Sequence, residues 1–184
     1  NEWTGTIPTR IGYLTDLIEL YLVDNQFSGQ IPSQIGKLTD LQILALGENG
    51  FSGTLPDELS NLGDLEIVSV NRKRGEEKGP GISGPLPLLK GMMNLDQVYL
   101  EHQKLTGKIP SGFLGDVSDR ADVIVDLSGN DLTGSIPGSL ERFYSLALYA
   151  ADNKITGVSS SLCGLPDFKG WMKGDMGDFG PGCD

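Results

Sequence analysis

Histidine and cysteine are scarce in this 184-residue chain, which contains one histidine, His102, and two cysteines, Cys163 and Cys183. A single histidine allows at most one histidine-based acid–base site, and a lone histidine on a strand is most often a surface residue. Neither cysteine stands in a motif that would activate a thiolate. The sequence therefore predicts no catalytic residues, and we do not expect an enzyme.

Metal ligands, membrane spans and glycosylation acceptors are also missing. Asp126-x-Ser128-x-Asn130 imitates the start of a calcium loop, but Asp131 replaces the turn glycine and Pro137 the bidentate glutamate. No run of about 18 apolar residues could cross a membrane, and no Asn-x-Ser/Thr sequon occurs. We expect no metal, no cofactor and no membrane span in this sequence.

Positive charge is in the minority, with 14 Lys and Arg against 25 Asp and Glu and a net charge of −11. Because phosphate binding needs a basic surface, nucleic acid is not an expected partner. The acidic excess either serves solubility alone or marks a surface for a basic protein or peptide.

The dominant feature of the sequence is a motif that is repeated along the chain. Asn1, Asn25 and Asn49 are spaced 24 residues apart, and each opens a phrase that ends in Ile-Pro or Leu-Pro. The period continues through glycines that each follow a serine or threonine: Gly5, Gly29, Gly53, Gly84, Gly107, Gly134 and Gly157. Apolar patterns precede them, as in Leu17–Asn25 and Leu41–Asn49. A fixed period of this length is typical of a solenoid.

These motifs resemble the leucine-rich repeat family, and the Gly-x-Ile-Pro phrase is similar to its plant-type subclass, over residues 1–166. The resemblance implies an α/β solenoid, a right-handed superhelix or horseshoe. Its parallel sheet lines the concave face, and short helical or 3-10 turns such as 33–38 lie on the convex face. We expect the leucines to point inward, the asparagine amide to bond backbone groups of the neighbouring coil, and the Gly and Pro to bend the chain.

The predicted organisation is a repeat array over residues 1–166, with about six to seven repeats, and a C-terminal cap over residues 167–184. Because Asn1 falls inside a unit, we expect an upstream strand and cap in a longer protein. An exposed solenoid end requires a cap, and a Cys163–Cys183 disulfide closing about 20 residues would add roughly 3 kcal/mol. Two free thiols are the alternative. The disulfide predicts an oxidising, extracellular or cell-surface location.

Two units break the period. The third contains extra residues at 71–81, with mixed charges and several glycines; this insertion is either a protruding loop on a binding rim or a tolerated, solvated addition. The fourth runs three residues long near 116–120, and we assign that change no role.

Ligand binding is expected on the outward strand positions, among which the pattern also places Val123 and Leu146. The candidate residues are Glu19, Tyr21, Asp24, Glu48, Glu66, Arg72, Asp96, Tyr99, Glu101, His102, Asp126, Tyr149 and Asp152. Eight of them are acidic and one is arginine. Tyr21, Tyr99 and Tyr149 are expected in one row, Glu66 beside Asp96 as like charges, and a local ion pair between Glu48 and Arg72.

Three functions follow from the resemblance. The family implies a cell-surface receptor or adhesion ectodomain that binds a protein or peptide on its acidic concave face. The alternative is a soluble, secreted protein resembling polygalacturonase-inhibiting proteins, which inhibit a cell-wall-degrading enzyme. An ice-binding role also occurs in the family, but the hydroxyl ladder that would suggest it belongs to the general motif: Thr4, Ser28, Ser52, Ser83, Thr106, Thr133 and Thr156.

Overall fold

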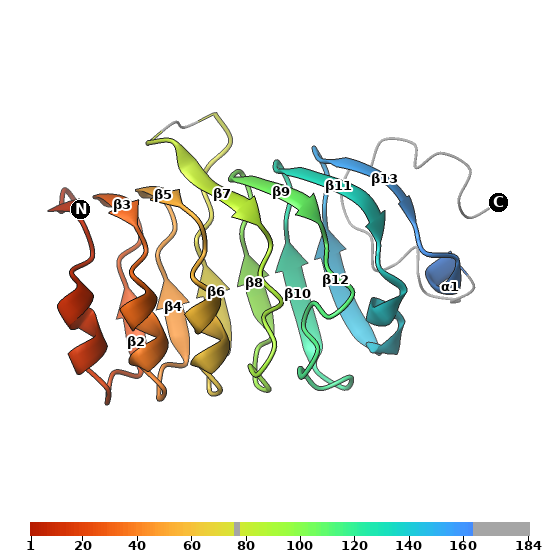
Figure 1. Cartoon of the computed structure of the whole chain (residues 1–184), viewed down its shortest axis with the longest axis horizontal. Helices are drawn as coiled ribbons and strands as arrows, with labels where there is room; N and C mark the ends of the chain where they lie inside the picture. Colours follow the sequence, from red (N-terminus) through yellow and green to blue (C-terminus); the bar gives the residue numbers. More distant parts are fainter. Residues whose placement is uncertain (76–77, 164–184) are drawn as a thin grey trace.

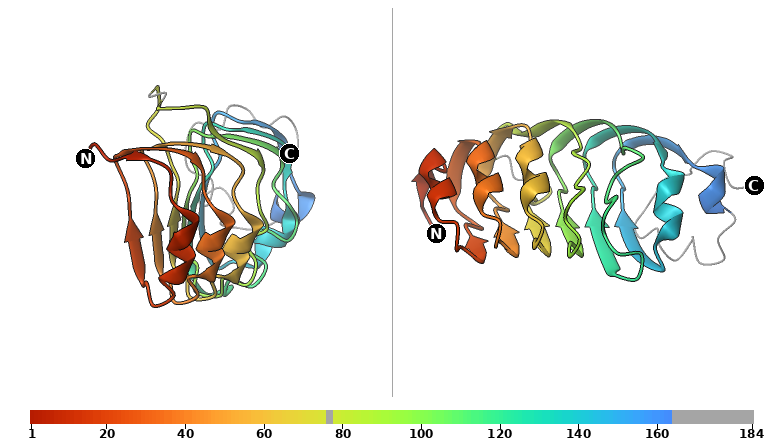
Figure 2. Two further views of the ribbon diagram at one scale, coloured as in Figure 1. Left: turned by 60° about the vertical axis from the view of Figure 1, so that its left-hand side comes forward. Right: turned by 60° about the horizontal axis from the view of Figure 1, so that its bottom comes forward.

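The structure, a computed structural model, describes residues 1–75 and 78–163. They form a solenoid in which the turns of the chain stack along the long axis (Figure 1). Each complete turn adds one strand to each of two parallel sheets and places a 3-10 helix or a set of turns on the remaining side (Figure 2). The predicted α/β solenoid is confirmed.

The first sheet, which forms the concave face, is made of six strands within the described residues. In spatial order these are β2 (Glu19–Tyr21), β4 (Ile43–Ala45), β6 (Ile67–Ser69), β8 (Gln97–Tyr99), β10 (Asp122–Asp126) and β12 (Ser145–Tyr149). Every pairing is parallel and joins equivalent positions of successive turns. Equivalent outward residues therefore form rows that run across the sheet.

A second parallel sheet was not predicted. Its seven strands within the described residues are β1 (Thr4–Gly5), β3 (Gln26–Gln30), β5 (Gly50–Gly53), β7 (Gly81–Pro85), β9 (Lys104–Lys108), β11 (Asp131–Ile136) and β13 (Lys154–Val158). It coincides with the Ser/Thr-Gly phrase, where the sequence suggested only a bend. Four hydroxyls donate to the glycine carbonyl of the preceding turn: Ser28 to Gly5, Ser83 to Gly53, Thr133 to Gly107 and Thr156 to Gly134. The phrase thus joins neighbouring coils.

Helical turns follow four of the Ile-Pro or Leu-Pro pairs, where proline has the extended backbone that precedes a helix. The 3-10 helices are η1 (Thr9–Tyr13), η2 (Ser33–Lys37), η3 (Asp57–Asn61) and η4 (Gly138–Arg142), and a short α1 (Ser160–Cys163) ends the described part. Gly36 lies so close to η3 that a Cβ there would be 2.3 Å from the Glu58 carbonyl oxygen. A glycine at this position therefore sets the spacing between η2 and η3.

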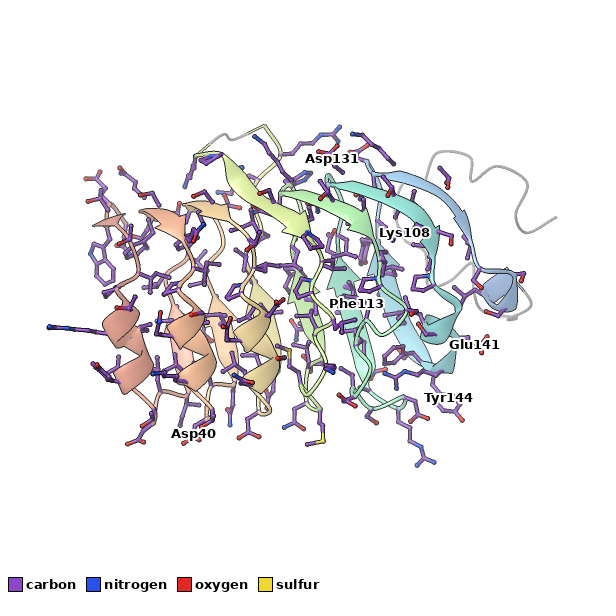
Figure 3. The ribbon with its side chains drawn as sticks, in the orientation of Figure 1. Asp40, Lys108, Phe113, Asp131, Glu141 and Tyr144 are labelled. Carbon is purple, nitrogen blue, oxygen red and sulfur yellow. The ribbon has the colours of Figure 1, made fainter. Side chains whose placement is uncertain are left out.

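Leucine, isoleucine and valine side chains fill the interior of the coil and form one continuous core. Leu41, Leu44 and Leu46 are fully buried, as the repeat pattern predicts, and Phe113 fills the place where the fourth turn has no regular helix (Figure 3). The outward assignment of Val123 and Leu146 is wrong, because both are buried. The longer strands β10 and β12 alternate along their whole length, which turns these two side chains into the core.

The predicted asparagine ladder is confirmed. Asn130 is buried; its side-chain oxygen accepts from the Leu105 N–H at 3.0 Å, and its amide nitrogen donates to the carbonyls of Leu100 and Leu127, both at 2.9 Å. Gln103 replaces asparagine in the preceding turn and joins its own coil to the one before it. It accepts from the Ile82 N–H at 2.8 Å and donates to the Val70 carbonyl at 2.6 Å. These amides satisfy backbone groups that the bend would otherwise leave unpaired.

The extra residues of the fourth turn have a structural role that the sequence did not suggest. The Asp116 carboxylate accepts a 2.7 Å hydrogen bond from the Gly91 N–H. From η4, the Arg142 guanidinium donates to the carbonyls of Leu114 and Val117. The lengthened connection is therefore held from both neighbouring turns.

The C-terminal predictions are not tested by the described residues. Cys163 ends α1, whereas the predicted cap, residues 167–184 with Cys183, lies outside the described part of the chain. The Cys163–Cys183 disulfide stays a prediction. Among the described residues, no helix is long and apolar enough to cross a membrane.

Candidate functional site

The tyrosines of the concave face lie in one row, as predicted. Strand pairing connects Tyr21, Ala45, Ser69, Tyr99, Asp126 and Tyr149 in that order. Tyr21 is 58% exposed, and Tyr99 and Tyr149 are half-buried. We call this set the tyrosine row. It offers flat aromatic surface that ends in hydroxyl groups.

Acidic side chains gather around the middle of the tyrosine row. We call Glu66, Asp96, Glu101 and Asp126 the central acids. Asp96 lies beside Glu66 on the neighbouring strand, where its N–H donates to the Glu66 carbonyl at 3.0 Å. Burial, and then the Glu66 charge, raise the pKa of Asp96. The expected like-charge pair of Glu66 and Asp96 is therefore present. In addition, Asp96 Oδ1 is buried without a hydrogen-bond partner among the described residues.

Glu101 is the most perturbed of the central acids. Burial raises the pKa of its carboxyl from 4.5 to about 7, and the nearby Asp126 and Glu48 charges act in the same direction. A hydrogen bond with the Asn71 side chain opposes this rise. One carboxyl oxygen, Oε2, is buried without a hydrogen-bond partner in the described part of the chain. Tyr99 next to it also has a raised pKa, from burial and then the Glu101 charge.

A second row lies where the strands bend toward the asparagine ladder. Asp24, Glu48, His102 and Asp152 all have positive φ there, between 53° and 58°, and Gly129 adopts the same conformation. A Cβ on Gly129 would be 2.2 Å from the His102 imidazole, so glycine leaves the space that His102 occupies. The single histidine is therefore a bend residue. We call Asp24, Glu48 and Asp152 the rim acids.

The insertion at 71–81 contacts every rim acid, which the sequence did not reveal. Lys78 Nζ lies 3.1 Å from Asp24 Oδ1, and this contact lowers the pKa of Asp24. Lys73 Nζ lies 3.9 Å from Glu48 Oε2, and an Arg74 guanidinium nitrogen lies 3.4 Å from Asp152 Oδ2. A run of mixed charges in a sequence is a weak signal for specific ion pairs, because the sequence does not indicate which carboxylates lie near its lysines and arginines in the fold.

The remaining candidates are placed as follows. Glu19 is exposed on the edge strand β2, so it lies on the predicted face. Arg72 is buried and donates from its guanidinium to the Gly79 carbonyl at 2.9 Å, which places it at the base of the insertion. Glu48 is buried as well, with Lys73 Nζ 3.9 Å from its carboxylate. The expected ion pair between Glu48 and Arg72 stays a prediction. Neither side chain presents an open surface to a ligand.

The described residues contain no group of three or more His, Cys, Asp or Glu side chains that could hold a metal ion. The side chains of the tyrosine row and the central acids offer carboxylates, tyrosine rings and hydroxyls. Such groups recognise cations and amphipathic side chains.

Comparison with known proteins agrees with this geometry. The Leucine Rich Repeat family model matches residues 16–38, 40–62 and 123–143. No curated protein gives a significant match. Among solved structures, the leucine-rich repeat ectodomain of the membrane receptor kinase GASSHO1/SCHENGEN3 from Arabidopsis thaliana, in complex with CASPARIAN STRIP INTEGRITY FACTOR 2, is 32% identical. It covers 94% of this chain with a TM-score of 0.77.

Two further solved structures are similar. The ectodomain of the Arabidopsis receptor kinase HAESA, in complex with a peptide hormone ligand, is 29% identical and covers 99% of this chain with a TM-score of 0.74. A plant ice-binding protein is 29% identical and covers 89% with a TM-score of 0.71. This chain spans 19%, 28% and 50% of the lengths of these three proteins.

The chain is therefore a leucine-rich repeat protein. Within that family it is of the plant type and resembles the ectodomains of plant receptor kinases.

Proposed function

We propose that this chain is a non-catalytic recognition module that binds a basic protein or peptide at the central acids of its concave face. The observation that supports this most strongly is the pair of buried carboxyl oxygens, on Asp96 and Glu101, without hydrogen-bond partners in the described structure. A buried carboxyl oxygen without a hydrogen-bond partner destabilises a fold. A ligand cation would remove that penalty, and the tyrosine row beside it would hold the ligand's apolar parts.

The solved relatives favour an extracellular or cell-surface location. Two of them are ectodomains of plant receptor kinases bound to CASPARIAN STRIP INTEGRITY FACTOR 2 or to a peptide hormone. We therefore place this chain in a cell-surface receptor or adhesion protein. A soluble, secreted inhibitor of a cell-wall-degrading enzyme is the alternative. A membrane-spanning segment in the full-length gene product would favour the receptor, and a secreted product without one would favour the inhibitor.

Ice binding is not our proposal, although one solved relative has that function. The ladder hydroxyls of Ser28, Ser83, Thr133 and Thr156 donate to backbone carbonyls of the neighbouring turn. Their regular spacing is thus explained by the joining of coils.

The proposal is tested with hexa-arginine as a defined basic probe, measured by isothermal titration calorimetry. A triple variant, Glu66→Gln, Asp96→Asn and Glu101→Gln, is expected to weaken binding about 10- to 100-fold, because each lost charge contact contributes about 0.5–1 kcal/mol. The affinity of the unchanged protein is expected to fall as salt is raised.

A matched control removes three exposed carboxylates from the convex helices η3 and η4: Asp57→Asn, Glu58→Gln and Glu141→Gln. Glu141 is labelled in Figure 3. The control changes the net charge by the same amount, and we expect its affinity to stay within about threefold of the unchanged protein. Equal losses in both triple variants would show that net charge alone attracts the probe, and would refute a site on the concave face.

A further inference from the structure

The base of the insertion packs tightly against the backbone of the neighbouring coil. A Cβ on Gly50 would be 2.3 Å from the Lys78 carbonyl oxygen, and a Cβ on Gly79 would be 2.7 Å from that of Gly50. The two backbones therefore touch, and only glycine fits at these positions. On the other side of the base, buried Arg72 bonds the Gly79 carbonyl at 2.9 Å. This base favours a definite position over a loose, solvated loop.

From this base the cations of the insertion reach in both directions along the rim. Lys78 contacts Asp24 in the first described turn and also donates to the Glu48 carbonyl at 3.2 Å. Arg74 contacts Asp152, which follows the last strand of the concave sheet. One short segment thus places positive charge against rim acids near both ends of the described array, on either side of the central acids.

We propose that the insertion is an internal competitor for a basic ligand: Arg74 and Lys78 occupy the exposed rim acids Asp152 and Asp24, and a ligand that extends beyond the central acids must displace them. This inference rests on the proposed function and deepens it, because it assigns the insertion a regulatory contact at the same face. The side chains of Arg74 and Asp152 are 80% and 56% exposed. Such exposed pairs contribute little, so the competitor is easily displaced by a ligand with several cations.

The test is the affinity of hexa-arginine for a double variant, Arg74→Ser and Lys78→Ser. Releasing two exposed ion pairs is expected to tighten binding about 3- to 10-fold. The matched control removes two cations from the convex helices, Arg10→Ser and Lys37→Ser, both exposed. It makes the same change in net charge, so it measures the general electrostatic gain, which we expect to be less than about twofold at physiological salt.

The outcomes separate the two proposals. A gain in the insertion variant that exceeds the control supports the competitor. An equal gain in both variants overturns it, and a loss of affinity in the insertion variant overturns it too, because the insertion would then contact the ligand favourably. If substituting the central acids does not weaken hexa-arginine binding, the proposed function itself fails. If those substitutions act as expected and the insertion variant shows no excess gain, only the competitor is refuted.

Discussion

Replacing Glu101 with glutamine is expected to remove a pH-dependent loss of stability. The pKa of Glu101 rises from 4.5 to about 7 in the folded protein, mainly through burial. A raised acid pKa favours the neutral form in the fold, so this group stabilises the fold most below about pH 4.5. That stabilisation is lost as pH rises toward 7. Glutamine keeps the shape of the neutral acid without ionising.

The magnitude follows from the two pKa values. A fully buried carboxyl with this rise would contribute about 3 kcal/mol, at 1.36 kcal/mol for each tenfold change in proton affinity. Glu101 is partly exposed, and solvent screening lowers the expected effect to about 1–2 kcal/mol. The glutamine would retain part of the hydrogen bond with Asn71. It would also remove the repulsion between the Glu101 carboxylate and the charges of Asp126 and Glu48.

Urea denaturation at pH 5 and pH 8 measures this difference. The Glu101→Gln variant should be close to the unchanged protein at pH 5 and about 1–2 kcal/mol more stable than it at pH 8. Glu19→Gln, an exposed carboxylate on the edge strand of the same face, is the matched control and should change little at either pH. A stability difference for Glu101→Gln that is the same at both pH values would refute the reasoning.

Two further predictions concern the joints between coils. Asn130→Ala should lower the free energy of unfolding by about 2–4 kcal/mol, since it leaves buried backbone groups unpaired. The control is Asn94→Ala, at an exposed asparagine. Equal stability of the two variants in urea denaturation would contradict the role of the asparagine ladder. Gly36→Ala should lose about 1–3 kcal/mol from the clash with the neighbouring helix. The control is Gly63→Ala, because a Cβ at Gly63 would meet its nearest atom at 3.7 Å. Its stability should stay within about 1 kcal/mol of the unchanged protein. If thermal denaturation ranks the two glycine variants in the opposite order, close packing does not require glycine at position 36.

Much of the fold could be predicted because each coil repeats a local rule. The spacing of Leu41, Leu44 and Leu46 is sufficient to place them inward, and Asn130 bonds the neighbouring coil as its position in the repeat requires. The order of the rows follows from parallel pairing of equivalent positions, so the tyrosine row and the Glu66–Asp96 pair were also predictable. Repetition makes one unit's geometry valid for the next.

The failures occur where the chain departs from the repeat. Val123 and Leu146 turn inward because their strands are longer than the pattern suggests. The second sheet was missed because a glycine-rich phrase lacks strand propensity, and its strands form only when stacked coils supply the partners.

The sequence by itself determined the period, the inward and outward positions of the regular units, and the excess of acidic residues among the expected outward strand positions. Only the tertiary structure decided that Arg72 is buried and that Lys73, Arg74 and Lys78 meet the rim acids. The physical reason is that repeat positions are local and periodic, whereas these ion pairs join residues from different coils. Lys78 and Asp24 are 54 positions apart along the chain, and no pattern of spacing connects them until the stacked turns bring them together.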